Sequence, residues 1–211
     1  MYQYRYRSEP GPFGRGGRSL NHQGTKRLET PRLLLRPFEP EDAGAMYRNW
    51  ASDEAVTKFL SWPTHRTVSD SEAILREWAG QYSRDTFYNW AIVLKELGEP
   101  IGSIGAVELD DGVDSALIGY CIGQRWWHQG LTSEALKRVI GFFFEEVGAN
   151  RVESHHDPRN PHSGGVMKKC GMTCEGTLRQ CYRNNQGLCD ASYHAILAEE
   201  WIPDNQNKEE S

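Results

Sequence analysis

The stretch from Ile118 to Leu136 constrains the fold more than any other part of the sequence. Apolar residues at 116–122 predict a strand, and a helix is expected from about 132 to 147. Gly130 stands at the predicted helix start, where the first backbone N–H groups have no partner inside the helix. Together with the helix dipole, these groups attract anions such as phosphate. The sequence therefore predicts an anion site at a strand-to-helix turn.

The residues around Gly130 exclude two common nucleotide-binding loops. No lysine follows this glycine, so the loop is not a Walker A motif. The dinucleotide fingerprint Gly-x-Gly-x-x-Gly is also missing. A glycine lets a phosphate approach the backbone closely, and the hydroxyl groups of Thr132 and Ser133 supply two further donors. Taken alone, however, one glycine before a helix is typical of a simple N-cap, so the loop is compatible with a phosphate site without requiring one.

The order of the remaining elements sets the fold class. Strands are expected at 33–38, 90–94, 101–107, 116–122, 151–155, 173–183 and 188–198. Helices are expected near 40–50, 69–82, 132–147 and 162–170. The chain has no internal repeat, and it lacks the regular strand–helix alternation of a doubly wound fold. We expect one α/β domain over residues 28–203 with a single mixed, mostly antiparallel sheet flanked by helices.

Charge is unevenly distributed along the chain. The net charge is −5, yet residues 1–27 carry six basic residues and one acid, so the remaining chain carries −10. We expect residues 1–27 to be a disordered, basic leader rich in Gly, Arg and Tyr, and residues 204–211 to be a frayed tail. The acidic body argues against nucleic acid as the main ligand and mildly favours a cationic substrate.

The distribution of apolar residues and the cysteine content indicate the cellular compartment. No run approaches 18 apolar residues, and the first 24 residues lack the apolar core of a secretory signal. The expected protein therefore has no membrane association and is cytoplasmic. The cysteines are odd in number and form no Cys-x-x-Cys pair, which favours reduced core thiols over disulfides or zinc ligands. They are Cys121, Cys170, Cys174, Cys181 and Cys189.

Four ordered motifs resemble the GNAT acetyltransferases, and most closely their RimJ/RimL-like branch. Gly130 matches the first glycine of the family's pyrophosphate loop, although Trp127 and Thr132 depart from its general pattern. The branch's loop is similar to residues 126–135, Trp-Trp-His-Gln-Gly-Leu-Thr-Ser-Glu-Ala. The other three motifs are its opening Thr-x-Arg-Leu-x-Leu-Arg at 30–36, its Asn-x-x-Ser-x-x-Val-x-x-Lys-x-Gly at 160–171, and its closing Asp190, Tyr193 and Ile196-Leu-Ala.

This resemblance implies a GNAT fold, with the sheet splayed between its fourth and fifth strands. It implies that acetyl-CoA lies in the splay as co-substrate and that a primary amine attacks the thioester directly in a ternary complex. A backbone N–H near Cys121 or Ile122 would bind the thioester oxygen. The implied cofactor-binding residues are Cys121, Ile122, Gln129, Gly130, Leu131, Thr132, Ser133, Asn160 and Ser163.

The catalytic acid and base differ from those of many family members. Leu117 stands where many members carry a glutamate base, and Met167 stands where many carry a tyrosine acid. The RimJ/RimL-like branch often uses a serine instead, which corresponds to Ser163. Asn160 is expected to bond the pantetheine and to cap the helix that follows. Candidate bases, acting directly or through water, are Glu153, His155, His156 and Glu108.

Several alternatives stay open. His155 and His156 are adjacent, but the spacing places no third metal ligand, so no metal is expected. Cys121 is expected to be a core residue and not an acyl carrier. The acceptor is a protein N-terminus or a small amine, and the chain is a possible homodimer. Two other functions compete: a non-catalytic acyl-CoA-binding regulatory module, and an RNA- or ribosome-associated protein that uses residues 1–27.

Overall fold

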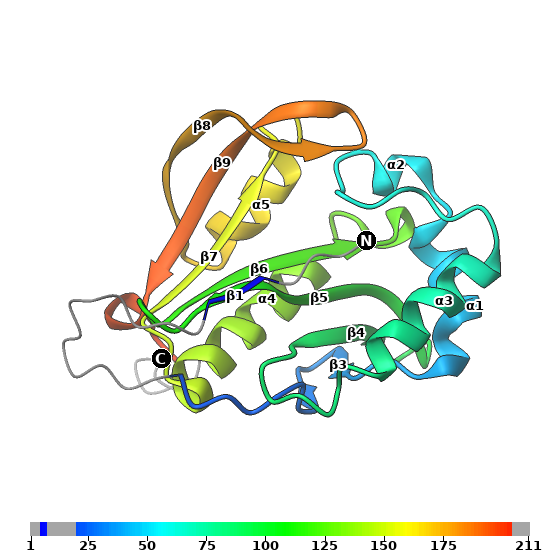
Figure 1. Ribbon diagram of the computed structural model, residues 1–211, viewed down its shortest axis with the longest axis horizontal. Coiled ribbons are helices and arrows are strands. Elements are labelled where there is room, and N and C mark those ends of the chain that lie inside the picture. Colours follow the sequence, from blue (N-terminus) through cyan, green and yellow to red (C-terminus); the bar gives the residue numbers. More distant parts are fainter. Residues whose placement is uncertain (1–4, 8–19, 204–211) are drawn as a thin grey trace.

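The computed structural model describes residues 5–7 and 20–203, and these form one open sheet with helices on both faces (Figure 1). The strands follow the order β2-β3-β4-β5-β6-β7-β9-β8, with β1 added beside β5. Neighbouring strands are antiparallel except for β6–β7 and β1–β5, which confirms the predicted mixed, mostly antiparallel sheet. The strands are β1 (Arg5–Arg7), β2 (Leu28–Glu29), β3 (Leu33–Arg36), β4 (Asn89–Leu94), β5 (Glu99–Asp110), β6 (Ser115–Ile122), β7 (Arg151–His156), β8 (Thr173–Asn184) and β9 (Gly187–Leu197).

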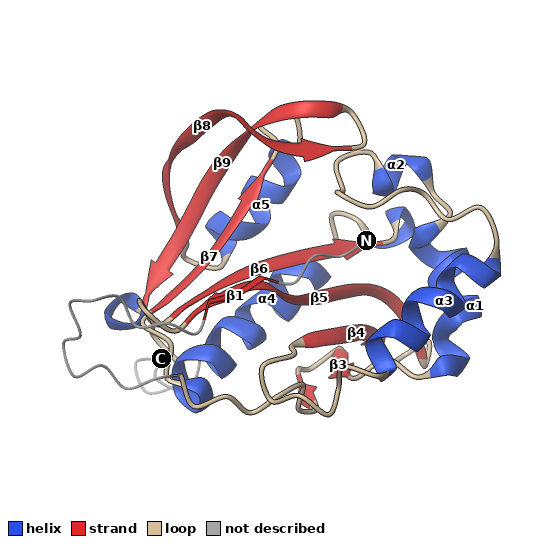
Figure 2. Cartoon of the chain, viewed as in Figure 1, coloured by secondary structure: helices blue, strands red, loops and turns tan. Residues whose placement is uncertain are grey.

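The helices divide between the two faces of the sheet (Figure 2). One apolar cluster joins α4 and α5 to one face, and a second joins α1 and α3 to the other. The helices are α1 (Ala43–Met46), α2 (Glu54–Thr57), α3 (Val68–Ala79), α4 (Leu131–Phe142) and α5 (Pro161–Lys169). Short 3-10 or π turns lie at η1 (Pro40–Asp42), η2 (Tyr47–Ala51), η3 (Gln124–Trp126), η4 (Phe143–Val147) and η5 (Ala198–Glu200).

Two helical segments differ from the sequence prediction. The helix expected over 40–50 is a succession of 3-10, α and π turns, although Ala43, Met46 and Trp50 are buried as its apolar spacing predicts. Helix α2 was not predicted. Its start is fixed by the Asp53 side chain, which accepts a hydrogen bond from the Ala55 N–H at 2.8 Å.

Strands β6 and β7 separate after a short parallel contact. Their ladder pairs residues 115–117 with residues 151–153 and then ends. The Ser154 hydroxyl donates to the Ile118 carbonyl at 2.7 Å, and beyond this point the strands diverge (Figure 1). The divergence divides the molecule into an N-terminal half through β6 and a C-terminal half of β7, α5, β8 and β9.

The predicted leader boundary at residue 27 is wrong, because residues 20–27 pack against the domain. Leu20 is buried at 4% exposure, and the Trp90 indole N–H donates to the Lys26 carbonyl at 2.6 Å. Thr25 bonds the Phe87 carbonyl at 2.8 Å. Arg5–Arg7 also pair with β5. The rest of the predicted leader (1–4, 8–19) and the predicted tail (204–211) lie outside the described residues.

Within the described ranges, no helix combines the length and apolar character needed to cross a membrane.

Candidate active site

A cavity of about 700 Å³ occupies the divergence between β6 and β7. Its lining includes the loop before α4, the first half of α5, and residues 55–56 and 58–62. It contains most of the residues singled out from the sequence: Cys121, Ile122, Gly130, Thr132, Ser133, His155, His156, Asn160 and Ser163. Four others, Gln129, Leu131, Glu153 and Glu108, are not among its lining residues. The sequence motifs therefore converge on one cleft, with these exceptions.

The loop before α4 has the geometry of an anion site. Gly130 has φ +76°, a left-handed conformation that glycine adopts without strain. Its carbonyl accepts the Glu134 N–H at 3.0 Å and the Ser133 hydroxyl at 2.9 Å, which closes the first helical turn. The N–H groups of the first turn are left to face a ligand.

Two motifs about 100 residues apart hold this loop in place. The Arg32 guanidinium bonds the Glu134 carboxylate at 2.7 Å and the Gln129 carbonyl at 3.1 Å. The Thr30 hydroxyl donates to the same Glu134 carboxylate at 2.6 Å. A charge-assisted network of this kind fixes the loop better than any single contact would. Sequence spacing gives no hint of it, because the partners belong to separate motifs.

Gln129 and Leu131 contribute backbone and not side chains to this site. The Gln129 side chain turns away and donates to the Arg125 carbonyl at 2.9 Å. The Leu131 side chain is 2% exposed and packs in the core between α4 and the sheet. Leu131 is the first residue of α4, so it would meet an anion through its backbone N–H, as the other residues of the first turn do, and not through its side chain.

The free edge of β6 presents backbone groups to the cavity. The Gly123 N–H donates to the Ile101 carbonyl of β5 at 2.9 Å, so the alternation of a strand directs the Cys121 N–H toward β5 as well. The N–H groups of Tyr120 and Ile122 then face the cleft. On this edge the Trp127 indole donates to the Ile122 carbonyl at 2.9 Å. Of the two predicted donors, Ile122 has the right direction and Cys121 does not.

Cys121 lies in the core face of β6. Its side chain belongs to the apolar cluster under α1 and α3, and its sulfur lies 3.3 Å from the Ser103 hydroxyl. Burial raises the pKa of the thiol to about 11. A thiol that stays protonated is a poor nucleophile, which favours a structural role.

Ser163 lies in the first turn of α5 and reaches across the cleft to β6. The Tyr120 hydroxyl donates to the Ser163 carbonyl at 3.0 Å and lies 3.1 Å from the Ser163 hydroxyl. Burial raises the pKa of Tyr120, so this phenol keeps its proton. The two hydroxyl groups form a proton-donating pair in the cavity wall. The sequence identified Ser163 but not Tyr120, since a tyrosine within an apolar strand looks like a core residue.

Asn160 and Met167 flank this pair on α5. Asn160 is the N-cap residue, but its side chain makes no capping hydrogen bond, contrary to the predicted second role. Its carbonyl accepts the Ser163 N–H at 3.2 Å, and the residue lines the cavity. The side chain is therefore available to a ligand. Met167 is fully buried and makes no polar contribution.

His155 forms the β7 wall of the cavity. Its ring contacts the rings of Tyr182 and Tyr193, with centroid distances of 4.5 Å and 5.1 Å. Burial, together with neighbouring His156, lowers the pKa of His155 to about 4, so the imidazole is unprotonated near neutral pH. Its Nδ1 is buried and has no hydrogen-bond partner among the described residues. An unprotonated imidazole at this place can accept a hydrogen bond, but the burial that keeps it neutral also makes it a weak base.

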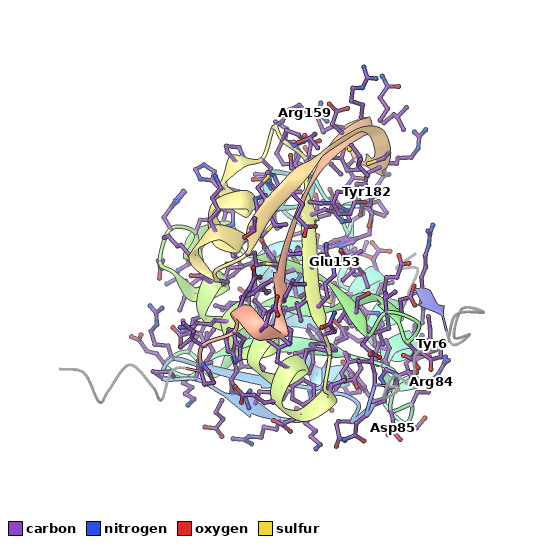
Figure 3. All side chains as sticks on the ribbon, turned by 90° about the vertical axis from the view of Figure 1, so that its left-hand side faces the viewer. Tyr6, Arg84, Asp85, Glu153, Arg159 and Tyr182 are labelled. Atoms are coloured by element: carbon purple, nitrogen blue, oxygen red, sulfur yellow. The ribbon has the colours of Figure 1, made fainter. Side chains whose placement is uncertain are left out.

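Glu153 pairs with Leu117 in the β6–β7 ladder, at the closed end of the cleft, and Figure 3 shows it below Tyr182. Its carboxylate is bound by the Arg151 guanidinium at 2.9 Å, and Arg151 also binds Glu175. Glu153 is thus engaged in an ion-pair cluster outside the cavity lining. Glu108 is in β5 and is likewise not among the lining residues.

His156 points to the opposite face of β7 from His155, since successive side chains of a strand alternate. Its ring lies 5.3 Å from that of His194, and its Nδ1 lies 2.9 Å from the Asp157 carbonyl oxygen. The two adjacent histidines therefore cannot bind one ion together. In the described part of the chain, no three His, Cys, Asp or Glu side chains are grouped to hold a metal.

Comparison with known proteins identifies the fold and its chemistry. Residues 32–173 match the family model described as an acetyltransferase (GNAT) domain. The chain belongs to the GNAT acetyltransferase family. This membership confirms the resemblance inferred from the motifs, and it makes the protein an acetyltransferase.

Two curated relatives align with this chain over nearly their whole length. The N-acetyltransferase p20 of Bacillus licheniformis is 31% identical over 179 residues, which cover 82% of this chain and 97% of that protein. The [ribosomal protein uS5]-alanine N-acetyltransferase of Escherichia coli is 28% identical over 185 residues, covering 84% and 93%. The chain thus resembles the RimJ/RimL-like branch, as its motifs predicted.

A solved GNAT structure supports the fold directly. The crystal structure of an acetyltransferase (GNAT family) from Bacillus anthracis has a TM-score of 0.72 with this chain at 26% identity. The match covers 82% of this chain and 99% of that one. The GNAT fold with an open, mostly antiparallel sheet is thereby established.

Proposed function

We propose that the protein transfers the acetyl group of acetyl-CoA to a primary amine by direct attack in a ternary complex. The observation that carries this proposal is the cavity between β6 and β7. It joins an anion-binding helix start to a free strand edge and a proton-donating pair. Each of these three features serves a different part of an acetyl-CoA thioester.

The pyrophosphate of acetyl-CoA would bind the first turn of α4. The backbone N–H groups after Gly130 donate to its oxygens, and the Arg32–Glu134 pair keeps the loop in shape. The Asn160 side chain, which makes no cap bond, would bond an amide of the pantetheine arm. The thioester then lies along the free edge of β6.

Carbonyl polarisation is assigned to the Ile122 N–H. This donor faces the cleft and belongs to a strand that β5 holds on its other side. The negative charge that develops on the thioester oxygen during amine attack is stabilised by a donor already fixed in position. Such a donor needs no reorganisation at the moment of reaction.

Two groups would handle the protons. His155, unprotonated near neutral pH, accepts a proton from the attacking amine, directly or through a water molecule. Ser163, hydrogen-bonded to Tyr120, donates toward the CoA thiolate as it leaves. A thiolate is only moderately basic, so this donation assists the reaction without being indispensable.

Acetyl-CoA binding tests the phosphate site. Gly130→Glu places a side chain and a negative charge where the pyrophosphate binds, so isothermal titration should show affinity reduced beyond detection. Gly98→Glu is the matched control: Gly98 also has a left-handed φ, +71°, with open space around its Cβ position. It should bind acetyl-CoA like wild type. Unchanged affinity in a folded Gly130→Glu protein would refute this site.

A further inference from the structure

The outer end of the cavity carries cationic side chains. Apart from histidines, the charged residues lining the cavity in the described chain are Lys58, Asp157, Arg159 and Lys169. Asp157 is already neutralised, because Arg159 binds its carboxylate through Nε at 3.0 Å and Nη2 at 2.6 Å. Asn184 donates a further hydrogen bond to the same carboxylate at 2.9 Å. No unpaired carboxylate therefore lines the described cavity.

Lys58 and Arg159 converge on one aromatic ring. The Lys58 ammonium lies 5.2 Å from the centre of the Phe59 ring, and the Arg159 guanidinium carbon lies 6.0 Å from it. These residues come from different halves of the molecule: Lys58 follows α2, and Arg159 precedes α5. Phe59 itself lines the cavity. The three side chains form a cationic mouth with an aromatic surface.

Both cations keep binding capacity. The bonds to Asp157 occupy Nε and Nη2 of Arg159, which leaves Nη1 without a hydrogen bond among the described residues. Lys58 makes no ion pair in the described part of the chain, and its side chain is exposed. A guanidinium and an ammonium that both contact the same cavity-lining ring suit a carboxylate or a phosphate group.

The mouth is held in place by the turn between β8 and β9. The Asn185 side chain donates to the Thr57 and Trp62 carbonyls at 2.8 Å and 2.7 Å, and its N–H donates to the Leu60 carbonyl at 3.1 Å. Figure 1 shows this turn beside α2. The segment that carries Lys58 is thus fixed against the half that carries Arg159, so the two cations are positioned before a ligand arrives.

We propose that the acceptor is an amine that also carries a carboxylate or phosphate group, bound at this mouth by Lys58 and Arg159. The inference rests on the proposed function, since it names the substrate class of the same cavity. It reverses the expectation from net charge: a purely cationic amine finds no unpaired carboxylate here, whereas an anionic group finds the unpaired Lys58 ammonium and the remaining N–H donors of the salt-bridged Arg159.

Paired amines that differ in the anionic group test this inference. The pairs are β-alanine with propylamine, glycylglycine with glycylglycinamide, and O-phosphoethanolamine with ethanolamine. Release of CoA thiol gives kcat/KM for each compound with wild type, Lys58→Ala, Lys58→Arg and Lys168→Ala. Lys168 is exposed on α5 and does not line the cavity, so its variant removes the same charge elsewhere.

Wild type should prefer the anionic member of at least one pair by about tenfold or more, as one charge-assisted contact permits. Lys58→Ala should lose most of that preference, while Lys58→Arg and Lys168→Ala keep it. The dipeptide and phosphate pairs distinguish a carboxylate site from a phosphate site. Equal use of both members of every pair, or a preference that survives Lys58→Ala, would overturn the proposal.

A binding measurement separates failure of this inference from failure of the proposed function. If no amine is acetylated, thermal unfolding is followed with CoA bound and each paired compound added. Stabilisation by an anionic member that disappears in Lys58→Ala supports the cationic mouth even without turnover. Absence of any such stabilisation overturns it.

Discussion

The Ser163 hydroxyl lies 3.1 Å from the Tyr120 phenol oxygen, and removing it should slow the reaction without unfolding the protein. In Ser163→Ala the Tyr120 hydroxyl still donates to the carbonyl of residue 163, so the contact between α5 and β6 survives. Because the leaving thiolate is only moderately basic, kcat should fall about ten- to thousandfold. Steady-state kinetics at saturating acetyl-CoA measures this loss.

Acetyl-CoA affinity and melting temperature are the controls for Ser163→Ala. Both should stay near wild type if the hydroxyl acts on the leaving group. A normal kcat combined with a lower melting temperature would show that Ser163 only supports the start of α5. In that case another residue or water protonates the thiolate.

His155 should make folding stability depend on pH. Its pKa in the folded protein is about 4, below the ordinary value of 6.5, so between these values the unfolded chain binds more protons. Above pH 6.5 His155 does not reduce the free energy of unfolding. As the pH falls from 6.5 toward 4, the free energy of unfolding decreases by at most about 3 kcal/mol because of this residue. Denaturant unfolding at several pH values should show this decline.

The His155→Phe variant isolates this effect. Phenylalanine keeps the ring contacts with Tyr182 and Tyr193 but does not titrate. The difference in unfolding free energy between the two proteins should change with pH in this window. His65 and His194, whose pKa values burial also lowers, remain in both proteins. A pH-independent difference would contradict an unprotonated, buried His155.

At the residue scale, the sequence identifies groups whose chemistry is tied to local spacing. Gly130 at a helix start and Ser163 in the next helix are recognisable because each lies in a short motif. Tyr120 is not, because its role depends on α5 crossing to β6. Glu153 was chosen for its charge, and its ion pair with Arg151 is a tertiary contact that spacing on the strand does not reveal.

At the element scale, the segment just before β3 and the first turn of α4 act together through Arg32 and Glu134. Glu134→Gln should loosen the loop before Gly130, because it removes the charge that binds the guanidinium. We expect acetyl-CoA affinity to fall about tenfold. Losses of this size follow when a residue that orients a ligand-binding group, without touching the ligand, is removed. Isothermal titration measures the change.

An exposed ion pair elsewhere provides the control for Glu134→Gln. Glu29→Gln removes the same charge from a carboxylate that bonds Arg27 and Lys95 outside the cavity. It should leave acetyl-CoA affinity within about twofold of wild type, since exposed pairs contribute little. Equal losses in both variants would mean that net charge, and not the Arg32 contact, controls binding.

The sequence predicts helices and strands correctly where a regular apolar pattern runs over many residues. It does not predict short elements that depend on a single hydrogen bond or contact. The strands from residue 90 onward and the helix at α4 follow directly from their patterns. Helix α2 was missed because it has only four residues and depends on the Asp53 cap. The parallel contact of β6 with β7 spans three residue pairs, too few to leave a trace in either strand's sequence.

At the scale of the whole molecule, residues 20–27 belong to the folded domain. Deleting residues 1–27 should cost about 3 kcal/mol or more, from exposing the site that Leu20 covers and losing the Thr25 and Lys26 hydrogen bonds. For a chain of this size that corresponds to a melting temperature lower by about 6–12 °C. Deleting residues 1–19 keeps these contacts and should cost clearly less. Equal melting temperatures for both deletions would restore the boundary at residue 27.

The leader boundary shows why composition misleads at this scale. Residues 20–27 look like the basic segment before them, and a single leucine gives no periodicity. Leu20 is nevertheless buried, because it belongs to the same core cluster as Tyr88 and Phe143. The overall fold was predictable because the family motifs extend over nearly the whole domain. The packing of residues 20–27 against the domain could not be predicted in this way.

Mass spectrometry of amines incubated with acetyl-CoA tests the central claim most directly. Wild type should produce an amine heavier by one acetyl group, together with an equal amount of free CoA thiol, only when acetyl-CoA and amine are both present. Protein recovered after exposure to acetyl-CoA alone should carry no acetyl group, because the amine attacks the thioester directly. Acetyl-CoA binding without any acetylated amine, or transfer from an acetylated protein after acetyl-CoA is removed, would contradict the account.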